Sequence, residues 1–82
     1  RFQFGPGTVS IGREVGSGIL LAQDGVVSRN HAELRYDGSN WIIRDLNSRN
    51  GTWINGVRVT EHTLKVGDQI GVGQSWLRVD GL

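Results

Sequence analysis

GTWINGVRV, at residues 51–59, is the stretch that decides the fold. Two short runs rich in β-branched and aromatic residues, 51–54 and 57–59, flank the pair Asn55-Gly56. Both central residues of a type I′ turn need a positive φ, which Asn and Gly adopt most readily, and this turn joins antiparallel strands. The stretch therefore predicts a tight β-hairpin.

The same two-residue alternation continues on both sides of the hairpin. Residues 31–36 place Ala32 and Leu34 on one face and Glu33 and Arg35 on the other, which is typical of a half-buried strand. Further strand-like runs occupy residues 8–11, 19–22, 41–45, 69–72 and 76–79. Short strands separated by turn residues predict an all-β chain that folds as an antiparallel β-sandwich.

Composition restricts the class of protein. The chain has 82 residues, 13 glycines and no cysteine, so we expect a single domain with many turns, no disulfides and no thiolate metal site. No apolar run is long enough to cross a bilayer, and we expect no membrane insertion in this segment. The absence of cysteine and the use of Arg for eight of nine basic residues fit a cytoplasmic protein.

Templates for enzymes and metal sites do not fit. Asp45 and Asn47 begin like a calcium loop, but Arg49 puts a cation at the fifth position. Ser28, His31 and Asp45 are the residue types of a hydrolase triad, yet no Gly-x-Ser-x-Gly turn presents the serine. We expect no catalytic residue, no metal and no cofactor.

Nucleic-acid binding is also disfavoured. The formal net charge is only +1, whereas nucleic-acid-binding domains usually carry a clustered basic face. Trp41, Trp53 and Trp76 could stack on bases, but each lies in a strand-like run. We expect at least two of them in the core.

Polar loops interrupt the strands at residues 12–18, 23–30 and 46–50. They carry Arg13, Arg29 and Arg49, together with hydroxyl and amide side chains. If these loops meet at one end of the sandwich, the guanidinium groups form an anion-binding pocket.

Four motifs in these loops occur in an order and spacing that resemble one family. They are Gly12-Arg13, Ser28-x-x-His31, Asn47-Ser48-Arg49-Asn50-Gly51-Thr52 and Asn55-Gly56. This set resembles the forkhead-associated (FHA) domain. The resemblance implies a sandwich of about ten or eleven short strands whose loops bind phosphothreonine peptides.

The resemblance also bears on the ends of the chain. Residues 1–4 resemble the second strand of the family, so the first family strand is missing and residues 76–79 are expected at an unpaired edge. We therefore expect residues 1–82 to be one FHA-like domain cut from a longer protein.

The resemblance assigns roles to the site residues one by one. Arg13 and Ser28 resemble the phosphate-binding arginine and serine of the family, and Arg29 and Arg49 are expected to reach the phosphate beside them. Asn50 resembles the asparagine that binds the main chain of the peptide.

Other positions resemble residues that hold the loops without touching the ligand; they are Gly12, His31, Gly51, Asn55 and Gly56. A candidate specificity loop comprises Val26, Gly73 and Gln74, placed to read the residue three positions after the phosphothreonine. These residues offer apolar surface and a neutral amide, so an aliphatic side chain is expected there.

The function implied is non-catalytic recognition of a phosphothreonine-containing segment of another protein, which mediates a phosphorylation-dependent protein–protein interaction. One alternative is an FHA-like module that acts as a phospho-independent assembly surface. A second alternative is a β domain that binds nucleic acid.

Overall fold

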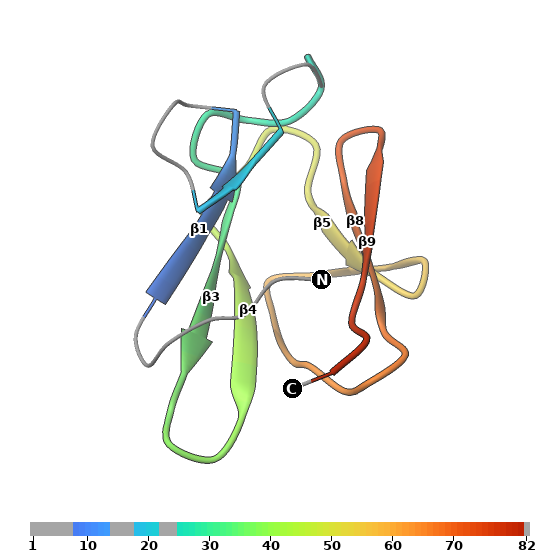
Figure 1. Ribbon diagram of the computed structural model, residues 1–82. Coiled ribbons are helices and arrows are strands. Elements are labelled where there is room, and N and C mark those ends of the chain that lie inside the picture. Colours follow the sequence, from blue (N-terminus) through green and yellow to red (C-terminus); the bar gives the residue numbers. More distant parts are fainter. Residues whose placement is uncertain (1–7, 14–17, 22–24, 82) are drawn as a thin grey trace.

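A computed structural model describes residues 8–13, 18–21 and 25–81, which form two β-sheets packed face to face (Figure 1). The strands are β1 (Thr8–Gly12), β2 (Ile19–Leu20), β3 (Ala32–Tyr36), β4 (Trp41–Asp45), β5 (Thr52–Ile54), β6 (Val57–Val59), β7 (Glu61–Thr63), β8 (Gln69–Val72) and β9 (Ser75–Arg78). The predicted all-β sandwich is confirmed, with nine strands in the described part of the chain. The strand expected at residues 1–4 lies outside the described residues.

The two sheets have different orders. One contains β2-β1-β3-β4-β7 and the other β6-β5-β8-β9. All pairs are antiparallel except β1 and β2, which run parallel with Ile11 opposite Ile19. Within the described residues β9 pairs only with β8, so it lies at the edge of its sheet.

The hairpin at 51–59 forms as its sequence predicts. Asn55 and Gly56 have φ values of 51° and 84°, and Ile54 pairs with Val57 across the turn. Both positive φ values match a type I′ turn, which suits the right-handed twist of the two strands it joins.

Strand β7 was not predicted from the sequence. Its residues, Glu61–Thr63, are polar, and among the described strands it pairs only with β4, with His62 opposite Ile43. An edge strand of polar residues lacks the alternation of apolar and polar positions that reveals a half-buried strand.

The core lies between the sheets. Ile11, Leu34 and Ile43 come from one sheet and meet apolar residues of the other. The buried apolar residues are Ile11, Ile19, Val27, Ala32, Leu34, Ile43, Ile54, Leu64, Ile70, Val72 and Val79. Because the chain has no cysteine, burial of these apolar side chains, and not a disulfide, stabilises the fold.

The expectation that at least two tryptophans lie in the core is wrong. Trp41 packs against the core, but Trp53 and Trp76 are 38% and 62% exposed. Their registers explain the error, because both lie opposite Gly71 on the outer face of the four-stranded sheet. Aromatic residues are favoured on both faces of a strand, so their presence in a strand does not show whether the side chain points into the core or toward solvent.

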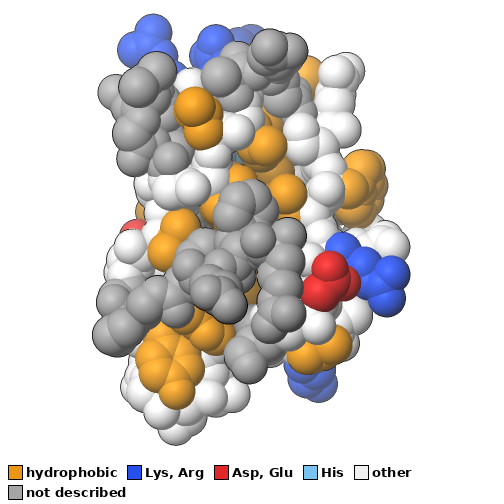
Figure 2. Space-filling model, in the orientation of Figure 1, with side chains coloured by type: hydrophobic (Ala, Val, Ile, Leu, Met, Phe, Trp, Pro, Cys, Tyr) orange, Lys and Arg blue, Asp and Glu red, His pale blue; other side chains and the backbone are white. Residues whose placement is uncertain are grey.

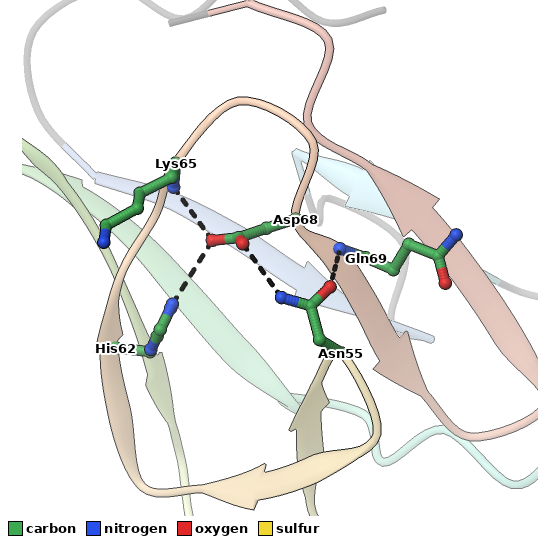
Figure 3. A network of polar contacts seen from close by, with 5 residues as sticks. All are labelled: Asn55, His62, Lys65, Asp68 and Gln69. Atoms are coloured by element: carbon green, nitrogen blue, oxygen red, sulfur yellow. Dashed lines mark hydrogen bonds and ion pairs between the residues drawn. The ribbon is translucent and has the colours of Figure 1, made fainter.

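A polar network centred on Asp68 fixes the end of the sandwich opposite the 46–51 loop (Figure 3). Asp68 Oδ1 accepts a hydrogen bond from Asn55 Nδ2 at 3.0 Å, and Asp68 Oδ2 accepts one from the Lys65 amide at 2.8 Å. His62 Nε2 lies 3.2 Å from the same oxygen, and Asn55 Oδ1 accepts from the Gln69 amide at 2.9 Å. Asn55 therefore joins its turn to the loop between β7 and β8.

The network changes the acidity of its central carboxyl. Burial by itself raises the pKa of Asp68, but hydrogen bonds from Lys65, Asn55 and His62 favour the carboxylate and together hold the pKa below its usual value. The carboxylate therefore contributes to stability only while it is ionised.

Acid unfolding tests this contribution. A folded pKa below the unfolded value of about 3.9 means that the stabilisation is complete above that value and is lost as the pH falls through the folded pKa. We expect the free energy of unfolding, measured in urea from about pH 6 to pH 2, to fall over this window. It should fall less steeply in Asp68→Asn, in which Asp45 still titrates. Parallel curves for the two proteins would contradict the assignment.

Candidate functional site

Three chain segments meet at one end of the sandwich (Figure 1). They are the end of β1 with Arg13, the loop of residues 25–31, and the loop of residues 46–51. The Arg13 amide donates to the Ser28 carbonyl at 3.2 Å, and the Leu46 amide donates to the His31 carbonyl at 3.0 Å. Backbone hydrogen bonds therefore hold the three segments side by side, as the anion-pocket hypothesis requires.

His31 connects two of these loops through its ring. The side chain is fully buried; its Nδ1 accepts from the Ser28 amide at 3.1 Å, and its Nε2 lies 2.7 Å from the Gly51 carbonyl oxygen. A ring nitrogen that accepts from an amide carries no hydrogen, so the hydrogen of the neutral ring is on Nε2 and is donated to Gly51. The ring is a fixed crosslink between loops 25–31 and 46–51.

Asp45 fixes the 46–51 loop from inside. Its carboxylate accepts from the Ser48 hydroxyl, from the Ser48 amide at 3.1 Å and from the Thr52 hydroxyl at 2.8 Å. The Gly51 amide in turn donates to Ser48 Oγ at 3.0 Å. Burial raises the pKa of Asp45, but the bonds from Ser48 and Thr52 outweigh it and lower the pKa. An ionised Asp45 thereby ties the end of β4 to the start of β5.

Cationic side chains surround this fixed frame. Arg13, Arg29 and Arg49 are exposed, and Figure 2 shows basic side chains at this end of the molecule. Arg13 Nε donates to the Val27 carbonyl at 3.1 Å, which anchors the guanidinium while leaving its two terminal nitrogens for another acceptor. An anchored guanidinium loses less freedom on binding an anion than a free one.

Ser28 has a hydroxyl hydrogen to give. Its Oγ accepts from the Arg49 amide at 3.1 Å, and among the described residues the hydroxyl donates to no acceptor. Because the accepting role is taken within the fold, the hydroxyl hydrogen is available to a ligand oxygen.

Asn50 follows Arg49 in the chain, and its side-chain amide contacts the loop of residues 25–31. Its Nδ2 donates to the Val26 carbonyl at 2.9 Å, and the Asn50 backbone carbonyl accepts from Trp53 Nε1 at 3.2 Å. The bond to Val26 orients the Asn50 side chain. Among the described residues Asn50 Oδ1 accepts no hydrogen bond, so it can accept one from a peptide N–H.

The residues predicted to form or support the site fall into three groups. Arg13, Ser28, Arg49 and Asn50 are linked by the contacts above, and the exposed Arg29 follows Ser28 in the same loop. Gly12, His31 and Gly51 lie buried beneath them. Asn55 and Gly56 lie at the other end of β5, where they support the Asp68 loop.

The candidate specificity loop lies at the same end as the cations. Thr52 pairs with Val72, which places the turn Gly73-Gln74 next to the 46–51 loop. Val26 is half-buried and joined to Asn50, whereas Val27 is a core residue with 1% exposure. Of the two valines, only Val26 can offer apolar surface to a ligand.

Sequence reasoning missed the frame beneath the site and one cation. Asp45, Ser48 and Thr52 were given no role in supporting the site from the sequence alone. The signal available was Asp followed three residues later by Ser, a common turn-forming pattern. Arg58 was also missed. A Cβ built at Gly51 would lie 2.5 Å from Arg58 Nε and 3.0 Å from its Cζ, so the guanidinium lies against the Gly51 backbone.

Comparison with known proteins identifies the architecture. The sequence pattern of the FHA domain matches residues 9–73, which is most of the chain. The chain belongs to the FHA family. Among solved structures, an FHA domain from a structural and functional analysis of phosphothreonine-dependent FHA domain interactions superposes with a TM-score of 0.88 and 40% identity, over 94% of this chain and 79% of that one. The resemblance stated from the sequence motifs is confirmed.

Curated relatives are longer than this chain. The FHA domain-containing protein FhaA of Mycobacterium tuberculosis is 42% identical over 74 residues, which are 90% of this chain and 14% of that protein. The glycogen accumulation regulator GarA of Mycolicibacterium smegmatis is 39% identical over 74 residues, which are 46% of its length. The chain therefore spans less than half of either relative. None of the residues that the structure describes form a helix able to span a bilayer.

Replacement of His31 tests the crosslink between the loops. His31→Ala leaves a cavity and removes the partners of the Ser28 amide and the Gly51 carbonyl, so we expect a loss of about 3–5 kcal/mol in the free energy of unfolding. His62→Ala, on an edge strand, should lose less. Urea unfolding followed by tryptophan fluorescence gives both values.

The tautomer of His31 offers an independent check on the native protein. A long-range proton–nitrogen NMR spectrum should show hydrogen on Nε2 and none on Nδ1 at neutral pH. Hydrogen on Nδ1 would contradict the bond from the Ser28 amide, and with it the crosslink.

Proposed function

We propose that this chain is a phosphothreonine-peptide recognition module that mediates a phosphorylation-dependent protein–protein interaction. The observation that carries the proposal is that Arg13, at the end of β1, lies beside Ser28 and Arg49, which are on the two loops that His31 crosslinks. Membership of the FHA family and the similarity to a domain studied for phosphothreonine-dependent interactions support it.

The chemistry of phosphate suits these residues. A phosphothreonine carries close to two negative charges at neutral pH and binds best where several charged donors converge. In the proposed complex Arg13, Arg29 and Arg49 supply the cations, and Ser28 donates its free hydroxyl hydrogen. Asn50 binds the main chain of the peptide beside the phosphate.

We further propose that the module does not catalyse a reaction. Both ring nitrogens of His31 are bonded to backbone groups, and the ring is fully buried, so it cannot exchange a proton with a ligand. The Asp45 carboxylate is likewise occupied by Ser48 and Thr52. A relative named a regulator fits a binding role. We also propose that residues 1–82 are one domain of a longer protein, and that the module works in the cytoplasm.

Arg13→Ala tests the phosphate site. Loss of a charge-assisted bond to phosphate costs about 1.5–3 kcal/mol, so we expect affinity for a phosphothreonine peptide to fall about tenfold to 150-fold. Arg35→Ala is the matched control, since Arg35 is an exposed arginine near the opposite end of β3. Isothermal titration with the phosphopeptide and its unphosphorylated twin measures both effects.

Two results of that titration would argue against the proposal. Unchanged affinity in Arg13→Ala would remove Arg13 from the site. Equal binding of the two peptides would instead support the phospho-independent assembly surface. Ser28→Ala should weaken binding by less than Arg13→Ala, because it removes a neutral donor.

Selectivity gives a further prediction. We expect the phosphothreonine peptide to bind more tightly than its phosphoserine counterpart, because the extra methyl group gains about 1–3 kcal/mol at most in an apolar niche. We also expect Ile, Leu or Val three positions after the phosphothreonine, where Val26 offers apolar surface. Equal affinity for the two phosphopeptides in the same titration would contradict the first expectation.

A further inference from the structure

Arg58 is a cation beside the site to which no role has been assigned. It is exposed on β6, and its guanidinium lies against the backbone of Gly51, the residue that follows Asn50. Within residues 8–13, 18–21 and 25–81 it takes part in no ion pair. Gly51 has a φ of 85° and no side chain, and both features let the guanidinium approach the loop.

Trp53 lies next to Arg58 on the same sheet face. The two residues are opposite each other in the pairing of β5 and β6, and the Trp53 indole is 38% exposed. Its Nε1 donates to the Asn50 carbonyl at 3.2 Å, so the ring is held beside the residue expected to bind the peptide main chain. The exposed indole of Trp53 therefore lies next to Asn50.

The same face continues across β8 to β9. Gly71 pairs with both Trp53 and Trp76, and a Cβ at Gly71 would lie 3.1 Å from Trp76 Cζ3 and 3.3 Å from Trp53 Cβ. Trp76 covers the Gly71 backbone, a known way to stabilise a glycine in a sheet. That stabilising role explains the position of Trp76, but it does not explain the 62% exposure of the ring, nor the charge of Arg58, which has no ion-pair partner in the part of the chain that the structure describes.

We propose that Arg58, Trp53 and Trp76 form an extension of the phosphopeptide site, here called the outer strip, which binds the flanking segment of the same phosphorylated partner. This proposal rests on the proposed function. An acidic side chain of the partner pairs with Arg58, and an apolar side chain covers the two indoles.

Two features favour this occupant over a separate partner. Arg58 lies against Gly51 and Trp53 is bonded to Asn50, so a peptide whose main chain binds Asn50 lies next to the outer strip. The chemistry of the outer strip also suits a peptide, because a guanidinium beside exposed aromatic surface can bind a carboxylate and an adjacent apolar side chain. Large exposed indoles are the residues that contribute most often to binding energy at interfaces.

A phosphothreonine peptide library tests the proposal. The peptides carry one fixed phosphothreonine and random residues over six positions on each side, and they are selected on the wild-type protein. We expect Asp or Glu to be enriched at one flanking position, and this enrichment to fall about threefold to tenfold in Arg58→Gln. Arg58→Lys should retain part of it. Arg78→Gln, on the outer side of the same sheet, is the matched control and should leave it unchanged.

The outcomes separate this proposal from the proposed function. If the library binds wild type and is lost in Arg13→Ala, but the flanking enrichment is equal in wild type and Arg58→Gln, the outer strip is refuted and the phosphate site stands. If no phosphorylated peptide binds wild type, both proposals fail.

The tryptophan indole signals give a second readout. In a proton–nitrogen NMR titration we expect the indole N–H signals of Trp53 and Trp76 to shift with a selected long peptide. They should shift much less with a peptide truncated close to the phosphothreonine. Trp41, which packs against the core in the other sheet, serves as the internal control. Shifts confined to the loop amides for both peptides would overturn the proposal.

Discussion

The His31 ring is the contact on which the binding end of this domain depends. The fully buried ring joins the Ser28 amide to the Gly51 carbonyl, and loss of the ring would leave both groups without this partner. Ordering a mobile loop when a ligand binds costs conformational entropy, so a dianion is bound best by charged donors that already converge. By crosslinking two loops through a neutral, uncharged ring, the fold holds the backbone under Ser28 and Arg49 fixed and leaves the charges at the surface. Asp45 in turn fixes the loop of residues 46–51 through its bonds to Ser48 and Thr52.

Much of this arrangement could be predicted from the sequence. The Asn55-Gly56 turn follows from the φ requirement of a type I′ hairpin, and alternation gives most strands of both sheets. The motifs around Arg13, Ser28 and Asn50 place the site on three loops, and the contacts between those loops bring the three residues together. The turn, the strands and the motifs are each encoded in a short run of neighbouring residues, so a single sequence displays them, whereas the contacts between the loops are seen only in the fold.

Other features depend on pairing across the fold. Trp53 and Trp76 face outward because of the register on either side of Gly71, and β7 is identified only by its pairing with β4. Asp68 gathers partners from three separate segments, and Arg58 reaches Gly51 from the neighbouring strand. A hairpin register taken from the Asn55-Gly56 turn would have placed Arg58 beside Trp53. It would not have shown that the guanidinium lies against Gly51.

The central claim is that one preformed site, at the end of the sandwich held by His31, binds the phosphate. The most direct measurement is an amide NMR titration of the whole 82-residue chain with a phosphothreonine peptide. The account predicts the largest shifts at Arg13, Ser28, Arg49 and Asn50, with little change at the Asp68 loop at the other end. Shifts centred on the Asp68 loop, or equal shifts with the unphosphorylated peptide, would contradict it.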